Sequence, residues 1–293
     1  MEQALTLAPD VTGWRVIRPA ELPLGALLLG RPVAEVASTL PRLFNLCRVA
    51  QGMAARLALG LPDTGDADAL RDEILRDHML RLMVTLPPLA GLSPRAPTAD
   101  QGLALFGPVR RLPDSPEALT AWLAAGQGMA PLVARIAMAF DAGEASARPL
   151  PVAGDANALS RGAVENSAAA RQIAHPLLRA VEALHGRGPL WRVLGMLADA
   201  EAALARRLPA PRLVAGVALV PAARGQYALA LSQAGGLVSR IERVTPTDHA
   251  TAPDGPLASA LEALPRDMRH LAPLVVALHD PCMGVRIEEP RDA

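Results

Sequence analysis

The sequence predicts an α+β fold, a mainly helical bundle with a small antiparallel sheet late in the chain. Before Pro211 the apolar residues recur mostly at helical spacing, and beyond it their period changes to that of strands. Of the 293 residues, 51% are hydrophobic, which is enough to bury a sizeable core. We therefore expect one large domain or two modest ones.

Two helices are predicted in the first third of the chain. Apolar residues recur at helical spacing over residues 33–59, before a run of Gly and Pro, so Cys47 is expected within or beside a helix. The second helix is predicted over residues 66–86, from Asp66 as its N-cap to two prolines that end it. Its apolar row at four-residue spacing includes His78, which we expect to be a packed, hydrogen-bonded core histidine.

The middle of the chain is predicted to alternate loops with Ala-rich helices. Residues 91–116 are rich in Pro and Gly, which is typical of a long loop, and Ser115 before a proline is typical of a helix cap. A second Gly- and Pro-rich stretch covers residues 143–154. The helices expected around these loops span residues 116–124, 130–140, 162–184 and 189–208.

The predicted sheet follows Pro211. Its strands are expected at residues 213–220, 227–232 and 237–244, and the last two form a hairpin about a turn that contains Gly235 and Gly236. Short helices are expected over residues 255–264 and 267–278. No internal repeat was found.

Charge and hydropathy exclude two classes of partner. The 29 basic and 29 acidic residues leave no net charge, whereas nucleic-acid binding depends on a basic surface. The longest apolar runs, residues 22–29 and 213–220, are shorter than the roughly 20 residues that cross a bilayer. The first residues lack the character of a secretory signal, and two cysteines cannot build a disulfide framework. We expect a cytoplasmic protein that binds neither nucleic acid nor membranes.

The candidates for chemistry are the two cysteines. The chain has no Gly-x-Ser-x-Gly motif and no phosphate-binding loop. A structural zinc site usually has four ligands, so Cys47 and Cys282 would need help, for example from His279. The alternatives are that each cysteine is a small buried apolar residue and that His279 is a tail histidine near solvent.

Both cysteine neighbourhoods resemble the paired cofactor motifs of the large subunit of nickel-iron hydrogenases. The family's first motif is Arg-x-Cys-Gly-x-Cys-x-x-x-His, and residues 42–51 read Arg-Leu-Phe-Asn-Leu-Cys-Arg-Val-Ala-Gln. Its last motif is Asp-Pro-Cys-x-x-Cys-x-x-His, and residues 280–288 read Asp-Pro-Cys-Met-Gly-Val-Arg-Ile-Glu. One cysteine of each pair is retained, and Phe44 and Val285 stand at the other two positions.

Further segments resemble the family in the same order. Residues 221–225, which contain Arg224, are similar to its Pro-Arg-Gly segment. Residues 245–247 and 255–261 are similar to its Pro-Thr and Gly-Pro-x-x-x-Ala-Leu stretches, and the helix with His78 to its histidine-bearing helix. The resemblance covers residues 22–86 and 211–288. It implies the fold of a shortened large subunit, as a single domain over residues 1–293.

The family's active site has four thiolates, two terminal on nickel and two that bridge to an iron carrying cyanide and carbon monoxide. Because two of the four cysteines are missing, and soft metals are held by thiolate number and geometry, we expect no hydrogen activation, no nickel and no enzymatic activity. Gln51 and Glu288 also stand where the motifs have histidines. Only five residues follow Glu288, so no cleavable carboxyl-terminal extension is expected.

This combination resembles the HupK-type hydrogenase accessory proteins. The resemblance implies a maturation factor, a scaffold on which the iron-cyanide-carbonyl fragment is assembled or held before transfer to the hydrogenase large subunit, with a HypC-type maturation chaperone as partner. It implies Cys47 and Cys282 as metal ligands, although Cys47 matches a bridging cysteine and Cys282 a terminal one. Arg224 would donate to a cyanide nitrogen, or it is a surface arginine in a loop.

Two other functions remain open. One is a large-subunit mimic that acts as a chaperone or protective binding protein without any cofactor. The other is a small redox or zinc protein that uses Cys47, Cys282 and His279.

Overall fold

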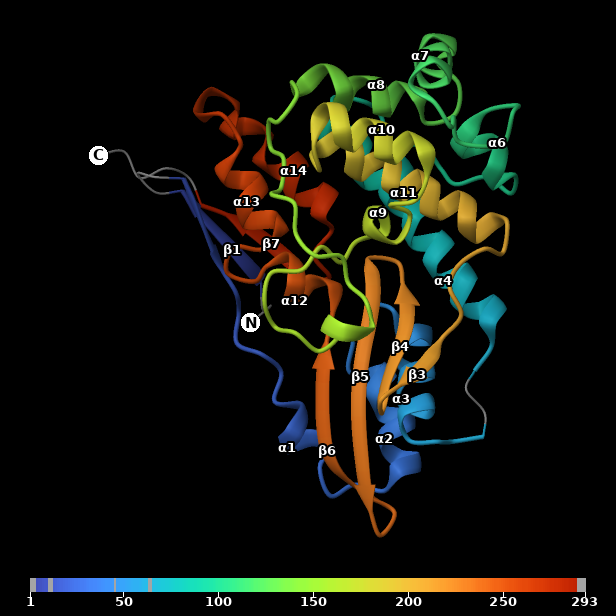
Figure 1. Cartoon of the computed structure of the whole chain (residues 1–293), viewed down its shortest axis with the longest axis vertical. Helices are drawn as coiled ribbons and strands as arrows, with labels where there is room; N and C mark the ends of the chain where they lie inside the picture. Colours follow the sequence, from blue (N-terminus) through green and yellow to red (C-terminus); the bar gives the residue numbers. More distant parts are fainter. Residues whose placement is uncertain (1–3, 10–12, 45, 63–64, 289–293) are drawn as a thin grey trace.

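Helices fill one end of the molecule, and a long antiparallel hairpin reaches the other (Figure 1). The computed structural model describes residues 4–9, 13–44, 46–62 and 65–288. The helices are α1 (Leu24–Leu28), α2 (Val33–Thr39), α3 (Arg48–Ala58), α4 (Ala67–Leu80), α5 (Leu86–Leu89), α6 (Gln101–Phe106), α7 (Pro116–Ala125), α8 (Ala130–Ala139), α9 (Ala168–Arg171), α10 (Pro176–His185), α11 (Pro189–Leu204), α12 (Pro246–Ala250), α13 (Pro256–Glu262) and α14 (Ala272–His279). The strands are β1 (Ala4–Pro9), β2 (Trp14–Ile17), β3 (Arg212–Val214), β4 (Val217–Ala222), β5 (Gly225–Ala234), β6 (Leu237–Val244) and β7 (Gly284–Ile287).

The larger core is built around α11, which is buried along nearly its whole length. It contacts α4, α8, α9, α10 and α14. Trp191, Leu194 and Leu197 are fully buried, and each such side chain stabilises the fold by about 1.5–3 kcal/mol. Gly195 allows α9 to approach, because a Cβ there would lie 2.1 Å from that of Ala169.

A second core lies between the four-stranded sheet and helices α2 and α3. The sheet is antiparallel in the order β3-β4-β5-β6, and its register pairs Leu219 with Ala228. Val36 and Ala54 from these helices and Leu40 from the turn after α2 pack in one cluster with Val220 and Leu229 from the strands. This sheet and its β5–β6 hairpin confirm the antiparallel sheet predicted late in the chain.

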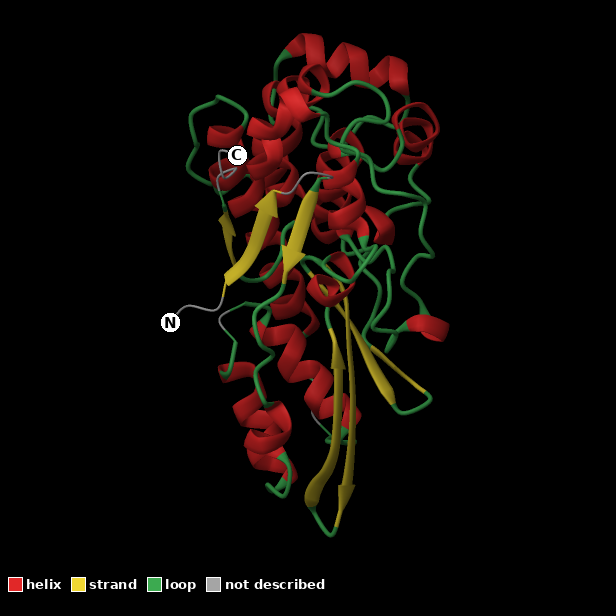
Figure 2. Ribbon diagram, turned by 90° about the vertical axis from the view of Figure 1, so that its left-hand side faces the viewer, coloured by secondary structure: helices red, strands yellow, loops and turns green. Residues whose placement is uncertain are grey.

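A three-stranded sheet was not predicted from the sequence. Its central strand β1 pairs antiparallel with β2 and parallel with β7, apart from the long hairpin (Figure 2). Leu5 and Leu7 alternate on β1 and are fully buried against the helical core. Because β7 follows Cys282 by one residue, this sheet anchors the segment that carries the second cysteine.

Two predicted helices end differently from the prediction. The helix expected over residues 33–59 is wrong as one element. A 3-10 turn (Leu40–Arg42) follows α2, and α3 begins only after Cys47, whose backbone is left-handed with a φ of 54°. The helix expected over residues 66–86 does not end at its prolines: a π-helical turn (Arg81–Thr85) leads into α5. Pro87 and Pro88 lie in the first turn of α5, where no amide hydrogen is needed.

Two other predictions were too coarse. The helix expected over residues 162–184 is wrong in its first part, since only α9 and α10 are helical there. The strand expected over residues 213–220 is two strands, because Ala215 and Gly216 form a turn with positive φ. The loop over residues 91–116 also contains the short helix α6.

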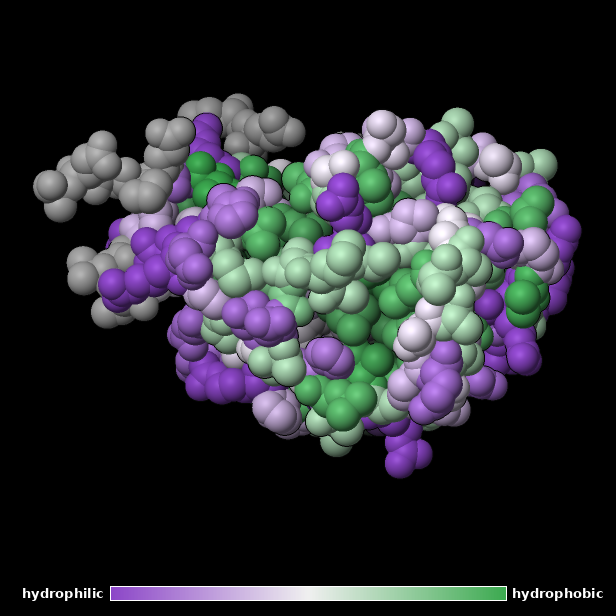
Figure 3. All heavy atoms as spheres, turned by 90° about the horizontal axis from the view of Figure 1, so that it is seen from above, coloured by the Kyte–Doolittle hydropathy of each residue, from purple (hydrophilic) through white to green (hydrophobic). Residues whose placement is uncertain are grey.

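The surface of the helical end is mixed. Seen from above, hydrophobic residues gather in the middle of this face and hydrophilic residues lie mostly toward its rim (Figure 3). Among the described residues, none of the helices combines the length and the apolar character that a membrane crossing requires.

Candidate functional site

The two cysteines line one cavity of about 560 Å³. Cys47 precedes α3, next to the sheet, and Cys282 lies between α14 and β7. Arg224 lines the same cavity from the turn between β4 and β5. The fold therefore brings together the three residues that the motifs single out.

Cys47 precedes the first turn of α3, in which two backbone amides are bonded to an acidic side chain. Glu73 of α4 accepts hydrogen bonds from the backbone N–H groups of Val49, at 2.8 Å, and Ala50, at 3.1 Å. Burial raises the pKa of the Cys47 thiol to about 12, and Asp77 and Glu73 add to this while Arg224 opposes it. Without a metal, Cys47 is therefore a neutral thiol at neutral pH.

Cys282 is tied to α12 through Thr247. The backbone N–H of Cys282 donates to Thr247 Oγ1 at 2.9 Å, and that hydroxyl donates to Cys282 Sγ at 3.0 Å. The hydroxyl group can do both because it has one hydrogen and two lone pairs. The position of the second sulfur therefore depends on α12.

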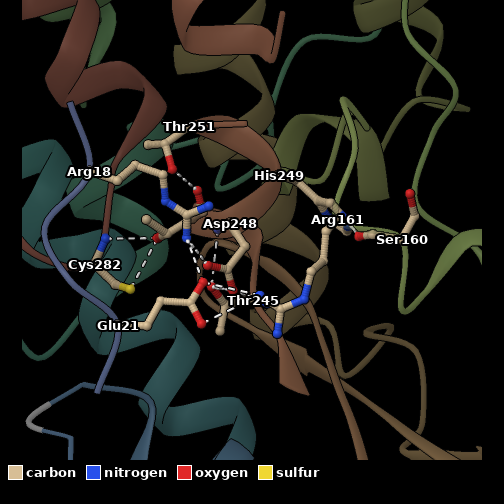
Figure 4. A network of polar contacts seen from close by, with 10 residues as sticks. Arg18, Glu21, Ser160, Arg161, Thr245, Asp248, His249, Thr251 and Cys282 are labelled. Carbon is tan, nitrogen blue, oxygen red and sulfur yellow. Dashed lines mark hydrogen bonds and ion pairs between the residues drawn. The ribbon is translucent and has the colours of Figure 1, made fainter. Parts of the chain in front are cut away.

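A polar network fixes α12 beside Cys282 (Figure 4). Thr245 and Asp248 form a capping box at the start of the helix. Asp248 also forms an ion pair with Arg18, whose guanidinium lies 3.9 Å from Glu21. Arg161 pairs with the same Glu21 at 3.0 Å. These contacts link the segment after β2 to α12, whose Thr247 is hydrogen-bonded to Cys282.

Arg224 is buried and bonded on several sides, so the alternative of a surface arginine is wrong. Its Nη1 donates to Asp77 Oδ2 at 2.7 Å and to Cys47 Sγ at 3.7 Å, and its Nε lies 3.3 Å from Asp280 Oδ2. Arg81 forms an ion pair with the other oxygen of Asp280. Burial opposes the charge of Arg224, but Asp280 and Asp77 outweigh it and raise the pKa of the guanidinium.

Further residues of the cavity were not predicted from the sequence. Arg243 of β6 lies over the ring of Phe44, 4.1 Å from its centroid, and its Nε donates to Tyr227 Oη at 3.2 Å. Gln51, which stands where the first motif has histidine, donates to the carbonyl of Leu46 at 2.9 Å. No local motif marks Arg243, because its contacts arise only when β6 meets the loop before α3.

His78 is a buried, hydrogen-bonded core histidine, as predicted. Its Nε2 lies 2.8 Å from Asp199 Oδ2, and Arg171 holds the same carboxylate in a two-pronged ion pair. Gln172 adds a further hydrogen bond to it at 2.8 Å. Burial raises the pKa of Asp199, but Arg171 and His78 outweigh it, so that the pKa lies well below its ordinary value. This network joins α4, α9 and α11 next to the cavity.

His279 does not share the cavity of the cysteines. It lines a separate cavity of about 20 Å³, room for one water molecule, and its Nδ1 lies 2.8 Å from the carbonyl oxygen of Val275. Burial lowers the pKa of His279 well below its ordinary value, and the side chain is half-buried at the end of α14, where a tail histidine near solvent was expected. Among the described residues, no group of three or more His, Cys, Asp or Glu side chains is placed to hold a metal ion.

The fold of this chain is similar to that of solved hydrogenases. The reduced, active form of the Ni-Fe-Se hydrogenase from Desulfomicrobium baculatum matches 93% of this chain and 94% of its own, with a TM-score of 0.60 and 12% identity. The H2-reduced NAD+-reducing [NiFe]-hydrogenase matches 92% of both chains, with a TM-score of 0.53 and 17% identity. The chain thus has the fold of a nickel-iron hydrogenase large subunit.

A sequence relative defines the family more closely. No protein-family model matches the chain. The hydrogenase expression/formation protein HupK of Rhodobacter capsulatus is 48% identical over 280 residues, which is 92% of this chain and 91% of the relative. The chain belongs to the HupK family of hydrogenase expression/formation proteins.

Proposed function

We propose that this chain is a non-enzymatic maturation factor for nickel-iron hydrogenase. It holds an iron-cyanide-carbonyl fragment as its cargo between Cys47 and Cys282 and hands the fragment on to the large subunit. The observation that supports this most directly is that both thiols and Arg224 face one cavity within a large-subunit fold.

The two sulfurs suit a weakly held cargo. An iron that already carries strong-field ligands needs few further donors, whereas nickel would find only two thiolates. Each iron-sulfur bond forms as a thiol loses its proton, because the thiolate is the ligand. The raised pKa of Cys47 therefore opposes binding and favours release of the fragment. Arg224, whose orientation Asp77 and Asp280 fix, would donate to a cyanide nitrogen.

A surface groove next to the cysteine cavity also reaches Cys282. A groove of about 660 Å³ along β6 shares Phe44, Arg243 and Cys282 with the cysteine cavity. A HypC-type maturation chaperone and the hydrogenase large subunit are the partners that this role implies, and the exchange would take place in the cytoplasm.

The test is infrared spectroscopy of the chain after anaerobic co-expression with the maturation machinery. We expect cyanide and carbonyl bands in the purified protein, and their loss in a Cys47→Ala, Cys282→Ala double variant. Val285→Ala is the matched control, because Val285 stands where the motif has its other cysteine but does not line the cavity. Bands that persist unchanged in the double variant would rule out these ligands.

The alternative is a large-subunit mimic that acts as a chaperone or protective binding protein without cofactor. The neutral state of the half-buried Cys47 thiol favours it, since a protein that binds no metal needs no thiolate. Full hydrogenase maturation in both single cysteine variants would support this alternative over the scaffold.

A further inference from the structure

We propose that Arg243 makes the cysteine cavity selective for anionic metal complexes over bare divalent cations. This inference rests on the proposed function and names the class of cargo that the site accepts. Its starting point is the charge of the cavity wall: three guanidinium groups, from Arg81, Arg224 and Arg243, line the cavity, and none of the described lining residues is a carboxylate.

Two of the three guanidinium groups are neutralised by partners. Arg81 pairs with Asp280, and Arg224 lies between Asp280 and Asp77. Arg243 differs, because its contacts within the described chain are with neutral groups, the ring of Phe44 and the hydroxyl and ring of Tyr227. The wall therefore carries one uncompensated positive charge, and Arg243 is its source.

Other carboxylates near the cavity are already committed to partners. Glu73 acts on Cys47 but accepts the backbone amides of Val49 and Ala50. Asp248 acts on Tyr227 but pairs with Arg18 and caps α12. Glu21 and Glu242 line the adjoining groove with Arg243 but pair with Arg161 and Arg240. None of these four carboxylates replaces the missing partner of Arg243.

The guanidinium of Arg243 is also held in a fixed place. Stacking on Phe44 and the hydrogen bond to Tyr227 restrain its plane, while its two terminal nitrogens have no acceptor among the described residues. These nitrogens can donate to an anionic ligand such as cyanide. In the motif, a cysteine thiolate stands at the position of Phe44. Here an aromatic ring replaces that anionic donor, and the guanidinium of Arg243 stacks on the ring.

The consequence is selection by charge. A bare divalent cation that enters is repelled by the uncompensated guanidinium, and the low dielectric of a partly buried site strengthens this repulsion. A metal that already carries cyanide ligands is attracted instead and accepts charge-assisted hydrogen bonds. The cavity would then admit a preassembled anionic complex and discriminate against free Zn²⁺, Ni²⁺ or Fe²⁺.

The test is calorimetric titration of the reduced, purified protein under anaerobic conditions with two probes, hexacyanoferrate(II) and Zn²⁺. In Arg243→Gln we expect the affinity for hexacyanoferrate(II) to fall about tenfold or more, the usual effect of losing a charge-assisted contact, and the affinity for Zn²⁺ to rise. Arg212→Gln removes the same charge from an exposed position of the same sheet and should change neither affinity. Arg243→Lys should keep the discrimination against Zn²⁺, because it keeps the charge.

Equal binding of hexacyanoferrate(II) by wild type and Arg243→Gln would overturn the proposal, and so would loss of discrimination in Arg243→Lys. Thermal unfolding of each variant establishes that it is folded, and the lysine variant tests the charge should the glutamine variant not fold. The outcome is separate from that of the infrared experiment. If loaded protein shows no cyanide or carbonyl bands while anion binding depends on Arg243, the scaffold function fails and the selectivity stands.

Discussion

The guanidinium of Arg224 lies between an acid and a thiol, since the same Nη1 that donates to Asp77 also donates to Cys47 Sγ, at 3.7 Å. The contact joins the turn after β4 to the start of α3. A carboxylate is a stronger hydrogen-bond acceptor than a thiol. The hydrogen bond from Nη1 to Cys47 is therefore the weaker of the two while the sulfur is protonated. The reactivity of Cys47 should report on this balance.

Alkylation of Cys47 should be slow at neutral pH and should keep accelerating far into the alkaline range. The raised pKa, about 12, means that the thiolate fraction still grows where an ordinary cysteine, with a pKa of about 8.5, is already fully ionised. We expect the rate to rise tenfold per pH unit until about pH 12. Mass spectrometry of alkylated Cys282→Ala protein measures this rate, because Cys47 is then the only cysteine. A rate that levels off near the ordinary pKa would contradict the raised pKa of this thiol.

Replacing Arg224 by methionine should strongly destabilise the fold. Asp77 and Asp280 would lose their shared cation, and removal of one partner from a buried ion pair typically costs about 3–5 kcal/mol. Urea denaturation measures the free energy of unfolding. The control is Arg212→Gln, which breaks an exposed pair with Asp155 and should cost at most about 1 kcal/mol. Equal losses in both variants would mean that Arg224 has no special structural role.

Gly195→Ala should destabilise the packing of α11 against α9. The added Cβ would lie 2.1 Å from the Cβ and 2.4 Å from the Cα of Ala169, so one helix must shift, at a cost of about 1–3 kcal/mol or more. Thermal or urea unfolding measures the loss. In Gly25→Ala, on α1, the added atom meets a side chain at 3.5 Å, an ordinary contact, so this control should be neutral or slightly stabilising. A Gly195→Ala variant as stable as wild type would contradict this prediction and show that α9 can move away from α11 at little cost.

The sequence predicted those elements whose apolar periodicity and whose capping or turn residues lie within one short segment of the chain. The β5–β6 hairpin, the caps Asp66 and Ser115 and the buried row of His78 are of this kind. The three-stranded sheet was missed because β1 and β7 are short and pair across nearly the whole chain. The interruption between α2 and α3 was missed because apolar residues continue at helical spacing through it. The left-handed backbone of Cys47 is seen only in the structure.

The residues of the site likewise divide into those that the sequence identified and those that only the fold brings together. Motif similarity singled out Cys47, Cys282 and Arg224, which the fold brings to one cavity. It did not find Arg243 or the role of Thr247, since both depend on which segments meet in space. His279 was expected in a tail near solvent but is half-buried, because the sequence does not reveal that the end of α14 packs next to Arg192.

The network around Asp199 should make the fold sensitive to acid. Burial alone would raise the pKa of this carboxyl, but Arg171 and His78 lower it well below its ordinary value. A carboxyl whose pKa is lower in the folded state stabilises the fold above its unfolded pKa of about 3.9, and this stabilisation is lost as the pH falls below that value.

Asp199→Asn should therefore lose about 3–5 kcal/mol at pH 7, where Arg171 is left without its buried partner. The gap between wild type and variant should narrow as the pH falls below about 4, because wild type then begins to protonate the same group. Urea denaturation over this pH range measures the gap. Asp155→Asn, which removes an exposed carboxylate, should show a small gap at every pH. If the difference in unfolding free energy between wild type and Asp199→Asn does not change with pH, the charge of Asp199 is not what stabilises the packing of α4, α9 and α11.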